Sequence, residues 1–67
     1  MINVTPKAMR SLIAHSNASE TVRVIRLFKW GIQVSMEVQA RTFKPLPGDL
    51  VTFRESNYKV EDDNVNR

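Results

Sequence analysis

The N-terminal part of the chain alternates apolar and polar residues with the period of a helix. Apolar side chains recur three and four positions apart, at Met9, Leu12 and Ile13. Such spacing places them on one face of a helix. Thr5 precedes Pro6, an order typical of a helix start, because threonine caps free amides and proline has no amide to leave unpaired. The pattern predicts a helix over about residues 6–16, preceded by a short N-terminal strand at Ile2 and Val4.

The middle of the chain has the pattern of two strands. Residues 21–29 are rich in β-branched and aromatic side chains, which favour a strand. Their apolar positions change parity between Val24 and Ile25, so we expect either a strand buried on both faces or a bulge. Residues 32–41 alternate strictly, with the apolar set at Ile32, Val34, Met36, Val38 and Ala40. This alternation predicts one buried and one solvent face, and Trp30-Gly31 is the expected turn before it.

The C-terminal third predicts a second pair of strands. Residues 44–49 contain two prolines and a glycine, a composition typical of a loop. Strands are expected over about residues 49–54 and 58–61, with a tight turn at Ser56-Asn57 between them.

These elements predict an α+β fold in which one helix covers an antiparallel β-meander. We expect a single domain over residues 1–62. A polar and frayed end is expected at residues 63–67.

The length limits what the chain can build. It has 67 residues and a mass of 7.7 kDa, with 42% apolar and 25% charged residues. This is the composition of one globular domain. A domain of this size buries only about 60% of the surface that its unfolded chain exposes, so its margin of stability is small. The chain has no cysteine, which excludes disulfides, thiolate metal sites and cysteine nucleophiles.

Basic residues outnumber acidic ones over most of the chain. The formal net charge is +3, but three of the seven acidic residues stand together at Glu61-Asp62-Asp63. Residues 1–60 therefore carry nine basic and four acidic side chains. A basic body with an acidic end can attract phosphate groups, although solubility is the simpler explanation of so small an excess.

The residues that carry enzyme chemistry are few and isolated. His15 is the only histidine, and no motif places a serine or a carboxylate beside it. We interpret it as a cation near the end of the helix. The acidic residues 61–63 lack the spacing of a calcium loop, and residues 44–48 lack the glycines of a phosphate-binding loop. We therefore expect no catalytic residue, no metal site, no cofactor and a protein that is not an enzyme.

The aromatic and basic residues of the middle segment are the candidates for binding. A tryptophan in an exposed turn would anchor a protein partner, because tryptophan and arginine are enriched among interface hot spots. The predicted contact residues are Trp30, Phe28, Arg26 and Arg41. The leading prediction is a small, non-enzymatic protein-interaction or regulatory module. A small sheet with an open edge would also allow two copies to pair as a homodimer.

An alternative function uses the same segment to bind nucleic acid. Arg23, Arg26 and Lys29 recur every three residues, close to Phe28 and Trp30. A sheet face with such side chains can stack single-stranded bases and pair with phosphates. This alternative predicts contacts at Arg23, Arg26, Lys29 and Lys44 and an affinity that falls steeply with salt. The competing interpretation is that the aromatic residues fill the small core.

Several short segments resemble the A-type iron–sulfur carrier family (HesB/IscA-like). They are Ile2–Ala8, Leu12-Ile13, Val22–Val24, Val34–Val38, Pro47–Val51 and Tyr58–Asp62. The resemblance covers about residues 2–62 and implies the family's fold, in which a short strand and a capped helix precede a sheet. The family coordinates iron or a cluster through cysteines, one of which would fall at about Lys29 or Trp30. Since this chain has no cysteine, the resemblance implies a degenerate relative that keeps the scaffold without the metal ligands.

The hydropathy of the chain indicates no membrane segment. No stretch reaches the roughly 20 consecutive apolar residues of a membrane span, and the first residues lack the basic region and apolar run of a signal peptide. We expect a cytoplasmic protein that binds no membrane. Chains as short as this one are common among phage-encoded proteins, but no residue of the sequence indicates that origin.

Overall fold

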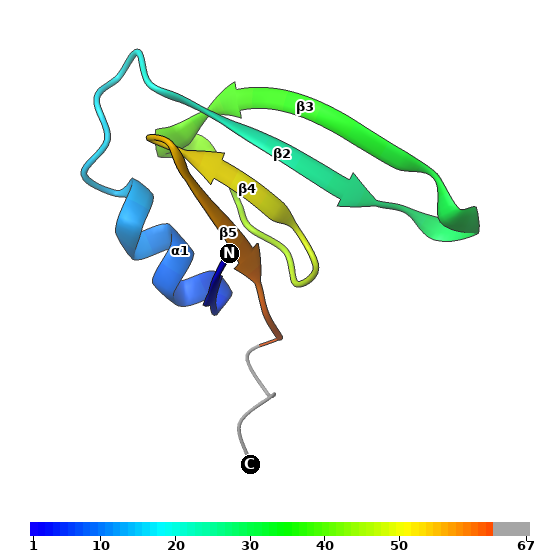
Figure 1. The fold of residues 1–67 in the computed structure, drawn as a ribbon. Helices are drawn as coiled ribbons and strands as arrows, with labels where there is room; N and C mark the ends of the chain where they lie inside the picture. Colours follow the sequence, from blue (N-terminus) through cyan, green and yellow to red (C-terminus); the bar gives the residue numbers. More distant parts are fainter. Residues whose placement is uncertain (63–67) are drawn as a thin grey trace.

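The computed structural model describes residues 1–62, and it confirms the predicted α+β class (Figure 1). Within these residues it contains one α-helix and a five-stranded sheet. The predicted frayed end at residues 63–67 lies outside the described residues. The elements are β1 (Ile2–Val4), α1 (Pro6–Ile13), β2 (Thr21–Leu27), β3 (Gln33–Gln39), β4 (Leu50–Phe53) and β5 (Ser56–Val60), with short 3-10 turns at Lys29–Gly31 and Ala40–Thr42.

Helix α1 starts as predicted and ends earlier. The Thr5 hydroxyl oxygen accepts a hydrogen bond from the Ala8 amide at 3.1 Å, as an N-cap does. The helix ends at Ile13 rather than at residue 16. Both the amide and the hydroxyl of Ser16 donate to the Ile13 carbonyl, at 3.1 and 2.7 Å. Serine side chains compete in this way with helical hydrogen bonding, so the chain turns and His15 lies beyond the helix.

The strand order differs from a simple meander. The order in the sheet is β1-β5-β4-β2-β3, so β4 pairs with β2 instead of with β3. All neighbours are antiparallel except β1 and β5, which are parallel. The register between β2 and β3 runs without a break from Thr21 opposite Gln39 to Leu27 opposite Gln33. The parity change in β2 is therefore no bulge. This strand carries apolar residues on both faces and takes an interior place in the sheet.

The C-terminal hairpin turns two residues earlier than its sequence predicts. The turn residues are Arg54 and Glu55, with φ angles of 50° and 68°, and Phe53 lies opposite Ser56. A two-residue hairpin turn with both φ values positive matches the twist of the strands. Asn and Gly are the usual residues there, which is why neither Arg54 nor Glu55 signals this turn.

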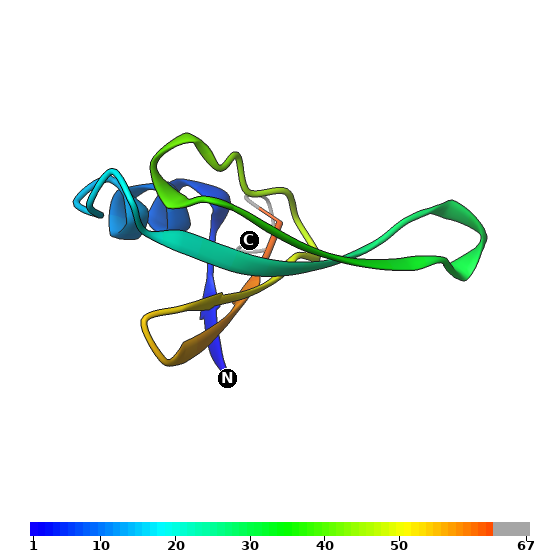
Figure 2. The same cartoon turned by 90° about the horizontal axis from the view of Figure 1, so that it is seen from above.

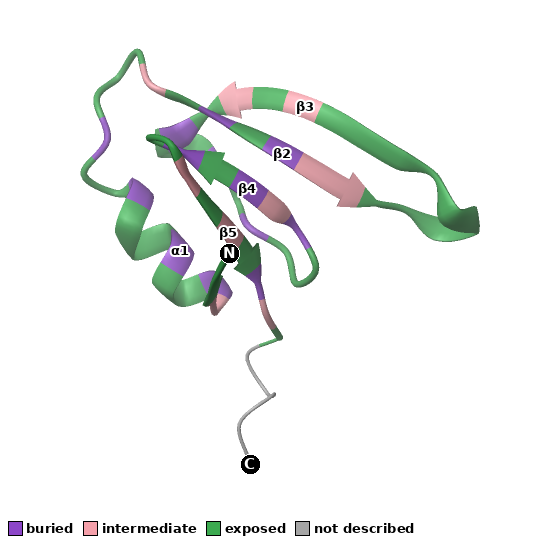
Figure 3. Cartoon of the chain, viewed as in Figure 1, coloured by how far each residue is buried: buried purple, intermediate pink, exposed green. Residues whose placement is uncertain are grey.

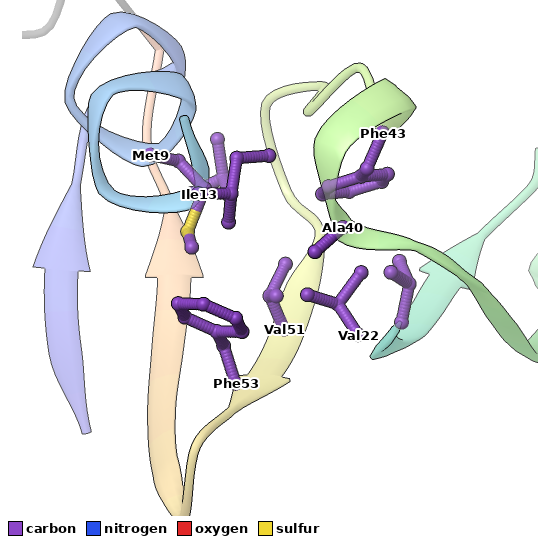
Figure 4. Close-up of a cluster of buried hydrophobic side chains, with 9 residues drawn as sticks. Met9, Ile13, Val22, Ala40, Phe43, Val51 and Phe53 are labelled. Carbon is purple, nitrogen blue, oxygen red and sulfur yellow. The ribbon is translucent and has the colours of Figure 1, made fainter. Parts of the chain in front are cut away.

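The core lies between α1 and one face of the sheet (Figure 4). Met9 and Ile13 of the helix face the sheet, whereas Leu12, predicted on the same apolar stripe, is exposed. The sheet contributes a set of buried residues: Val22, Val24, Val51, Phe53 and Val60. Ala40 and Phe43 follow β3 and also turn into the core. Because Ala40 is fully buried in a 3-10 turn, β3 ends at Gln39 and not at residue 41.

The segment between β3 and β4 crosses from one side of β2 to the other, on the same side of the sheet as α1 (Figure 2). Asp49, which is only 1% exposed, fixes the end of this segment directly before β4. Its carboxylate accepts hydrogen bonds from the Arg26 Nε and Nη2 atoms at 2.8 and 2.7 Å, and from the Leu46 amide at 3.0 Å. Its main chain accepts from the Val60 amide at 2.9 Å. One residue thereby ties the crossing segment to β2 and to β5.

A second ion pair joins the C-terminal hairpin to the segment before β2. The Glu20 carboxylate accepts two hydrogen bonds from Arg54, at 2.6 and 2.7 Å, and one from the Asn17 amide at 2.7 Å. The Arg54 guanidinium also lies over the Phe53 ring, 4.9 Å from its centre, a cation–π geometry. The bonds from Arg54, and then that from Asn17, lower the pKa of Glu20 from 4.5 to about 2.

Replacing Asp49 tests the support of the crossing segment. Asp49→Asn keeps an acceptor oxygen but leaves the Arg26 charge, which is mostly buried, without its partner. We expect the free energy of unfolding to fall by about 3 kcal/mol, measured by urea denaturation. The exposed Glu55→Gln is the matched control and should change it by less than about 0.5 kcal/mol. An Asp49→Asn protein as stable as the wild type would contradict this account.

Replacing Glu20 tests the second ion pair through its pH dependence. The folded pKa lies below the ordinary value, so the ionised carboxylate stabilises the fold fully above about pH 4.5. This contribution is lost as the pH falls toward 2. We expect Glu20→Gln to have a lower Tm than the wild type at neutral pH, and the difference to vanish near pH 2. Thermal unfolding followed by circular dichroism measures it. A constant difference at all pH values would contradict the assignment.

Candidate functional site

The hairpin of β2 and β3 extends beyond the rest of the sheet as an arm (Figures 1 and 2). Strand β4 pairs with β2 only from Arg23 to Ile25, whereas the pairing of β2 with β3 continues to Leu27 and Gln33. Beyond Ile25 the two strands of the arm therefore pair only with each other among the described residues. A two-stranded ribbon of this kind is marginally stable by itself in water.

The arm exposes large apolar side chains to solvent, and Figure 3 shows exposure increasing toward its tip. We call these residues the arm surface: Leu27, Phe28, Trp30, Ile32 and Val34. Trp30 is 92% exposed, Leu27 65%, Ile32 56% and Val34 38%. The alternation in residues 32–41 predicted a buried apolar face along the whole strand. That prediction is wrong for Ile32 and Val34, because the helix and the crossing segment do not reach that far along β3.

The tip of the arm is the predicted turn at Trp30-Gly31. The Phe28 amide donates to the Ile32 carbonyl at 2.7 Å and closes the turn. Trp30 has a φ of 72° and Gly31 a φ of 77°. Glycine adopts a positive φ without strain, but a bulky residue does so at a cost of about 1–3 kcal/mol. Trp30 thus combines an unfavourable backbone angle with a side chain that makes almost no contact within its own domain.

A groove of about 490 Å³ lies beside the arm, on the β2 side. One wall comes from the arm and includes Leu27, Phe28 and Lys29, and the other comes from residues 46–49 of the crossing segment. Leu46 in this second wall is 48% exposed. Asp49 and Arg26 also line the groove and neutralise each other as an ion pair, so Lys29 supplies the net charge of the groove.

Arg26, predicted as a contact residue for protein or nucleic acid, forms the bidentate pair with Asp49. These hydrogen bonds raise the pKa of Arg26 above its ordinary value, and the guanidinium supports the fold. Arg41 lies in the turn after β3, at the opposite end of this strand from Trp30. The seven residues of β3 separate them by about 20 Å. The structure therefore places Arg26 and Phe28 beside the same groove and Trp30 at the nearby tip of the arm, and it leaves Arg41 apart from them.

The basic residues of the nucleic-acid alternative do not share one surface. Arg23 lies on the sheet face that points away from the helix, directly opposite Glu37 in β3. Lys29 is at the tip of the arm, and Lys44 is in the crossing segment on the helix side. Arg26 is paired with Asp49. Arg26 lines the groove with Lys29 and a second pocket with Lys44, but Arg23 lies on the other face, so the described domain does not present all four side chains together.

Leu27, Ile32, Val34 and Leu46 are exposed residues that sequence reasoning missed as candidates. The alternating pattern predicted core positions for Ile32 and Val34, and the sequence predicted Leu27 in a strand and Leu46 in a loop without a role. The one available signal was the excess of apolar residues around a turn, from Leu27 to Val34, in a chain whose small core cannot cover them all.

Neither a metal centre nor a membrane helix is found in the described part of the chain. Within residues 1–62, no group of three or more His, Asp or Glu side chains is placed to hold a metal ion. Over the same residues, the helix is too short and too polar to cross a bilayer. Comparison with known proteins gives no relative: no protein-family model, curated protein or solved structure matches the chain.

Trp30→Gly tests whether Trp30 is independent of the core. Glycine accepts the positive φ, and the tryptophan side chain makes almost no contact to lose. We expect the free energy of unfolding to stay within about 1 kcal/mol of the wild type or to rise, measured by urea denaturation. Val24→Ala, which truncates a fully buried side chain, is the control that should destabilise by roughly 2 kcal/mol. Unfolding of Trp30→Gly would show that the tip supports the fold.

Proposed function

We propose that this chain is a non-enzymatic protein-interaction module that binds its partner through the arm surface and the adjoining groove. The proposal rests on the exposure of Trp30. This residue is 92% exposed and lies in the turn at the tip of the arm, which extends beyond the core (Figure 2). Tryptophan is the residue most enriched at interface hot spots. The proposed regulatory role would be exercised by binding through the same surface.

The arm surface supports this proposal because it brings no stability to the isolated domain. Leu27 lies on one face of the ribbon, and Val34 lies on the other, opposite Arg26. Apolar side chains on both faces of an uncovered ribbon gain stability only when a second surface removes them from water. The positive φ of Trp30 adds a local cost. Both costs are offset when a partner covers the arm.

The groove favours an apolar protein segment that carries acidic residues. Its exposed walls include Leu27, Phe28 and Leu46, and Lys29 provides a positive charge at its rim. Pairing of β2 with β4 ends at Ile25, so an extended segment could also reach the main chain of Leu27 in the manner of an added strand. The partner that fits is therefore an extended or helical segment with apolar anchors and a nearby carboxylate.

The nucleic-acid alternative stays a prediction: Arg26 lines one pocket with Lys44 and the groove with Lys29, but it is paired with Asp49, and Arg23 lies on the opposite face of the sheet. The relationship to the A-type iron–sulfur carriers also stays a prediction, since the comparisons provide neither a matching family nor a matching fold. We propose that the chain uses no metal or cofactor, in keeping with its lack of cysteine.

Affinity capture with variants of the arm tests the proposed function. The tagged wild type, Trp30→Gly and Leu12→Ala are each used to capture proteins from a lysate. Leu12 is an exposed leucine on the helix, away from the arm, and serves as the matched control. We expect a protein that the wild type and Leu12→Ala retain and Trp30→Gly loses by tenfold or more, since a hot-spot residue contributes about 2 kcal/mol or more.

Nuclease and salt separate this proposal from the nucleic-acid alternative. Binding to the arm surface should survive nuclease and moderate salt. Binding through phosphate contacts falls steeply with salt. A partner that Trp30→Gly binds as well as the wild type, or capture that nuclease abolishes, would overturn the proposal.

A further inference from the structure

Strand β3 forms one edge of the sheet, and its outer side is not paired with any strand of the described domain. It is seven residues long, whereas β1 at the other edge has three. An unpaired edge of this length is a template for another strand. Pairing at this edge would be a further interaction, separate from the groove and from the contacts of Trp30 in the proposed function.

The outward-facing amides of β3 can be assigned from its pairing with β2. The Ala40 amide donates to the Glu20 carbonyl at 3.0 Å, and the Phe28 amide donates to Ile32 at 2.7 Å. Hydrogen-bonded and non-hydrogen-bonded pairs alternate along an antiparallel ladder. The even-numbered residues of β3 therefore bond to β2. The N–H and C=O groups that point outward belong to the odd-numbered residues, which are Gln33, Ser35, Glu37 and Gln39.

This edge lacks most of the features that normally prevent strands from pairing. Its residues include no proline and no lysine, and its register contains no bulge. Glu37 is its single charge. Natural edge strands are usually protected by one or more of these devices, so this edge, with one charged residue, is only weakly protected against pairing.

The sequence of β3 is nearly the same in both directions, Gln-Val-Ser-Met-Glu-Val-Gln. A two-fold axis relates the two strands of a symmetric antiparallel pair, so residue matches at equal distances from the centre become contacts. We propose that β3 pairs with β3 of a second copy of this chain, antiparallel and centred on Met36. The two sheets then join into one continuous sheet.

In this register every residue of β3 has a partner in the second copy. Gln33 lies opposite Gln39, and Ser35 lies opposite Glu37, and both pairs consist of residues with outward-facing amides. All the outward N–H and C=O groups are satisfied as a result. A shift that centres the axis on Glu37 would instead oppose two carboxylates, which is destabilising. A shift that centres it on Ser35 would leave Val38 and Gln39 without a strand residue opposite them.

The same register covers apolar surface on the helix side of the sheet. Val34 lies opposite Val38 of the second copy, and Met36 lies opposite Met36. These are non-hydrogen-bonded pairs, in which side chains approach most closely. Val34 is 38% exposed, and Met36 and Val38 are half-buried in the single chain. The groove stays accessible, because it lies on the β2 side of the arm.

The mass of the protein in solution tests the pairing. Analytical ultracentrifugation across a concentration series should show a reversible monomer–dimer equilibrium. Ser35→Pro removes an outward amide and spares the hydrogen bonds of β3 to β2, so it should be monomeric with unchanged circular dichroism. A wild type that stays monomeric up to about 1 mM would overturn the proposal.

Charge at residue 35 tests the register. Ser35→Lys places an ammonium opposite Glu37 of the second copy, twice per dimer, and Ser35→Glu places a carboxylate there. We expect the dimer Kd to fall roughly three- to tenfold for Ser35→Lys and to rise by a similar factor for Ser35→Glu. In the register centred on Ser35, either charge would face itself and both variants would weaken the dimer. That result, or equal Kd values for the two, would overturn the proposed register.

The test of dimerisation can be separated from the test of the proposed function. Trp30→Gly leaves β3 unchanged and should dimerise like the wild type. Loss of the partner in Trp30→Gly and loss of the dimer in Ser35→Pro are therefore separate findings. Dimerisation lost in Trp30→Gly would mean that the tip, and not the β3 edge, makes the self-contact.

Discussion

The buried carboxylate of Asp49 is the contact on which the arrangement of this domain depends. It accepts two hydrogen bonds from Arg26 and one from Leu46, and the main chain of Asp49 bonds to Val60. The crossing segment must end beside β2 for β4 to insert between β2 and β5. A carboxylate buried in a small core costs several kcal/mol unless it is paired and hydrogen-bonded, so β2 must present an arginine at this point.

The position of Arg26 also marks where the core ends along the β2–β3 hairpin. Val22 and Val24, on the same face of β2, are fully buried under the helix and the crossing segment. Past Arg26, a single eight-residue helix and a short loop have no more apolar surface with which to cover the strands. The hairpin continues as an uncovered arm, and its apolar residues form the proposed binding surface. The small amount of apolar surface on the helix and the crossing segment therefore explains both the limited size of the core and the exposure of Trp30.

The groove and the proposed self-pairing edge lie on opposite sides of the same hairpin, although Val34 of the arm surface belongs to the self-pairing strand. The groove uses the β2 side and the crossing segment, whereas self-pairing uses the outer edge of β3. A dimer related by a two-fold axis would carry two grooves, so a partner with two binding segments would gain from the effective concentration of the second site. A small domain without disulfides also gains stability from association.

Local patterns in the sequence determined the helix with its Thr5 cap, the strands, the turn at Trp30-Gly31 and the α+β class, because caps, alternation and turn glycines act between near neighbours. Tertiary structure alone decided that β4 pairs with β2, that Arg26 meets Asp49, and that Arg54 and Glu55 form a turn held by Glu20. These depend on contacts between segments far apart in the chain. Whether an apolar residue is buried depends in the same way on what covers it. Ala40 and Ile32 therefore belong to the same alternating pattern, yet one lies in the core and the other on the arm.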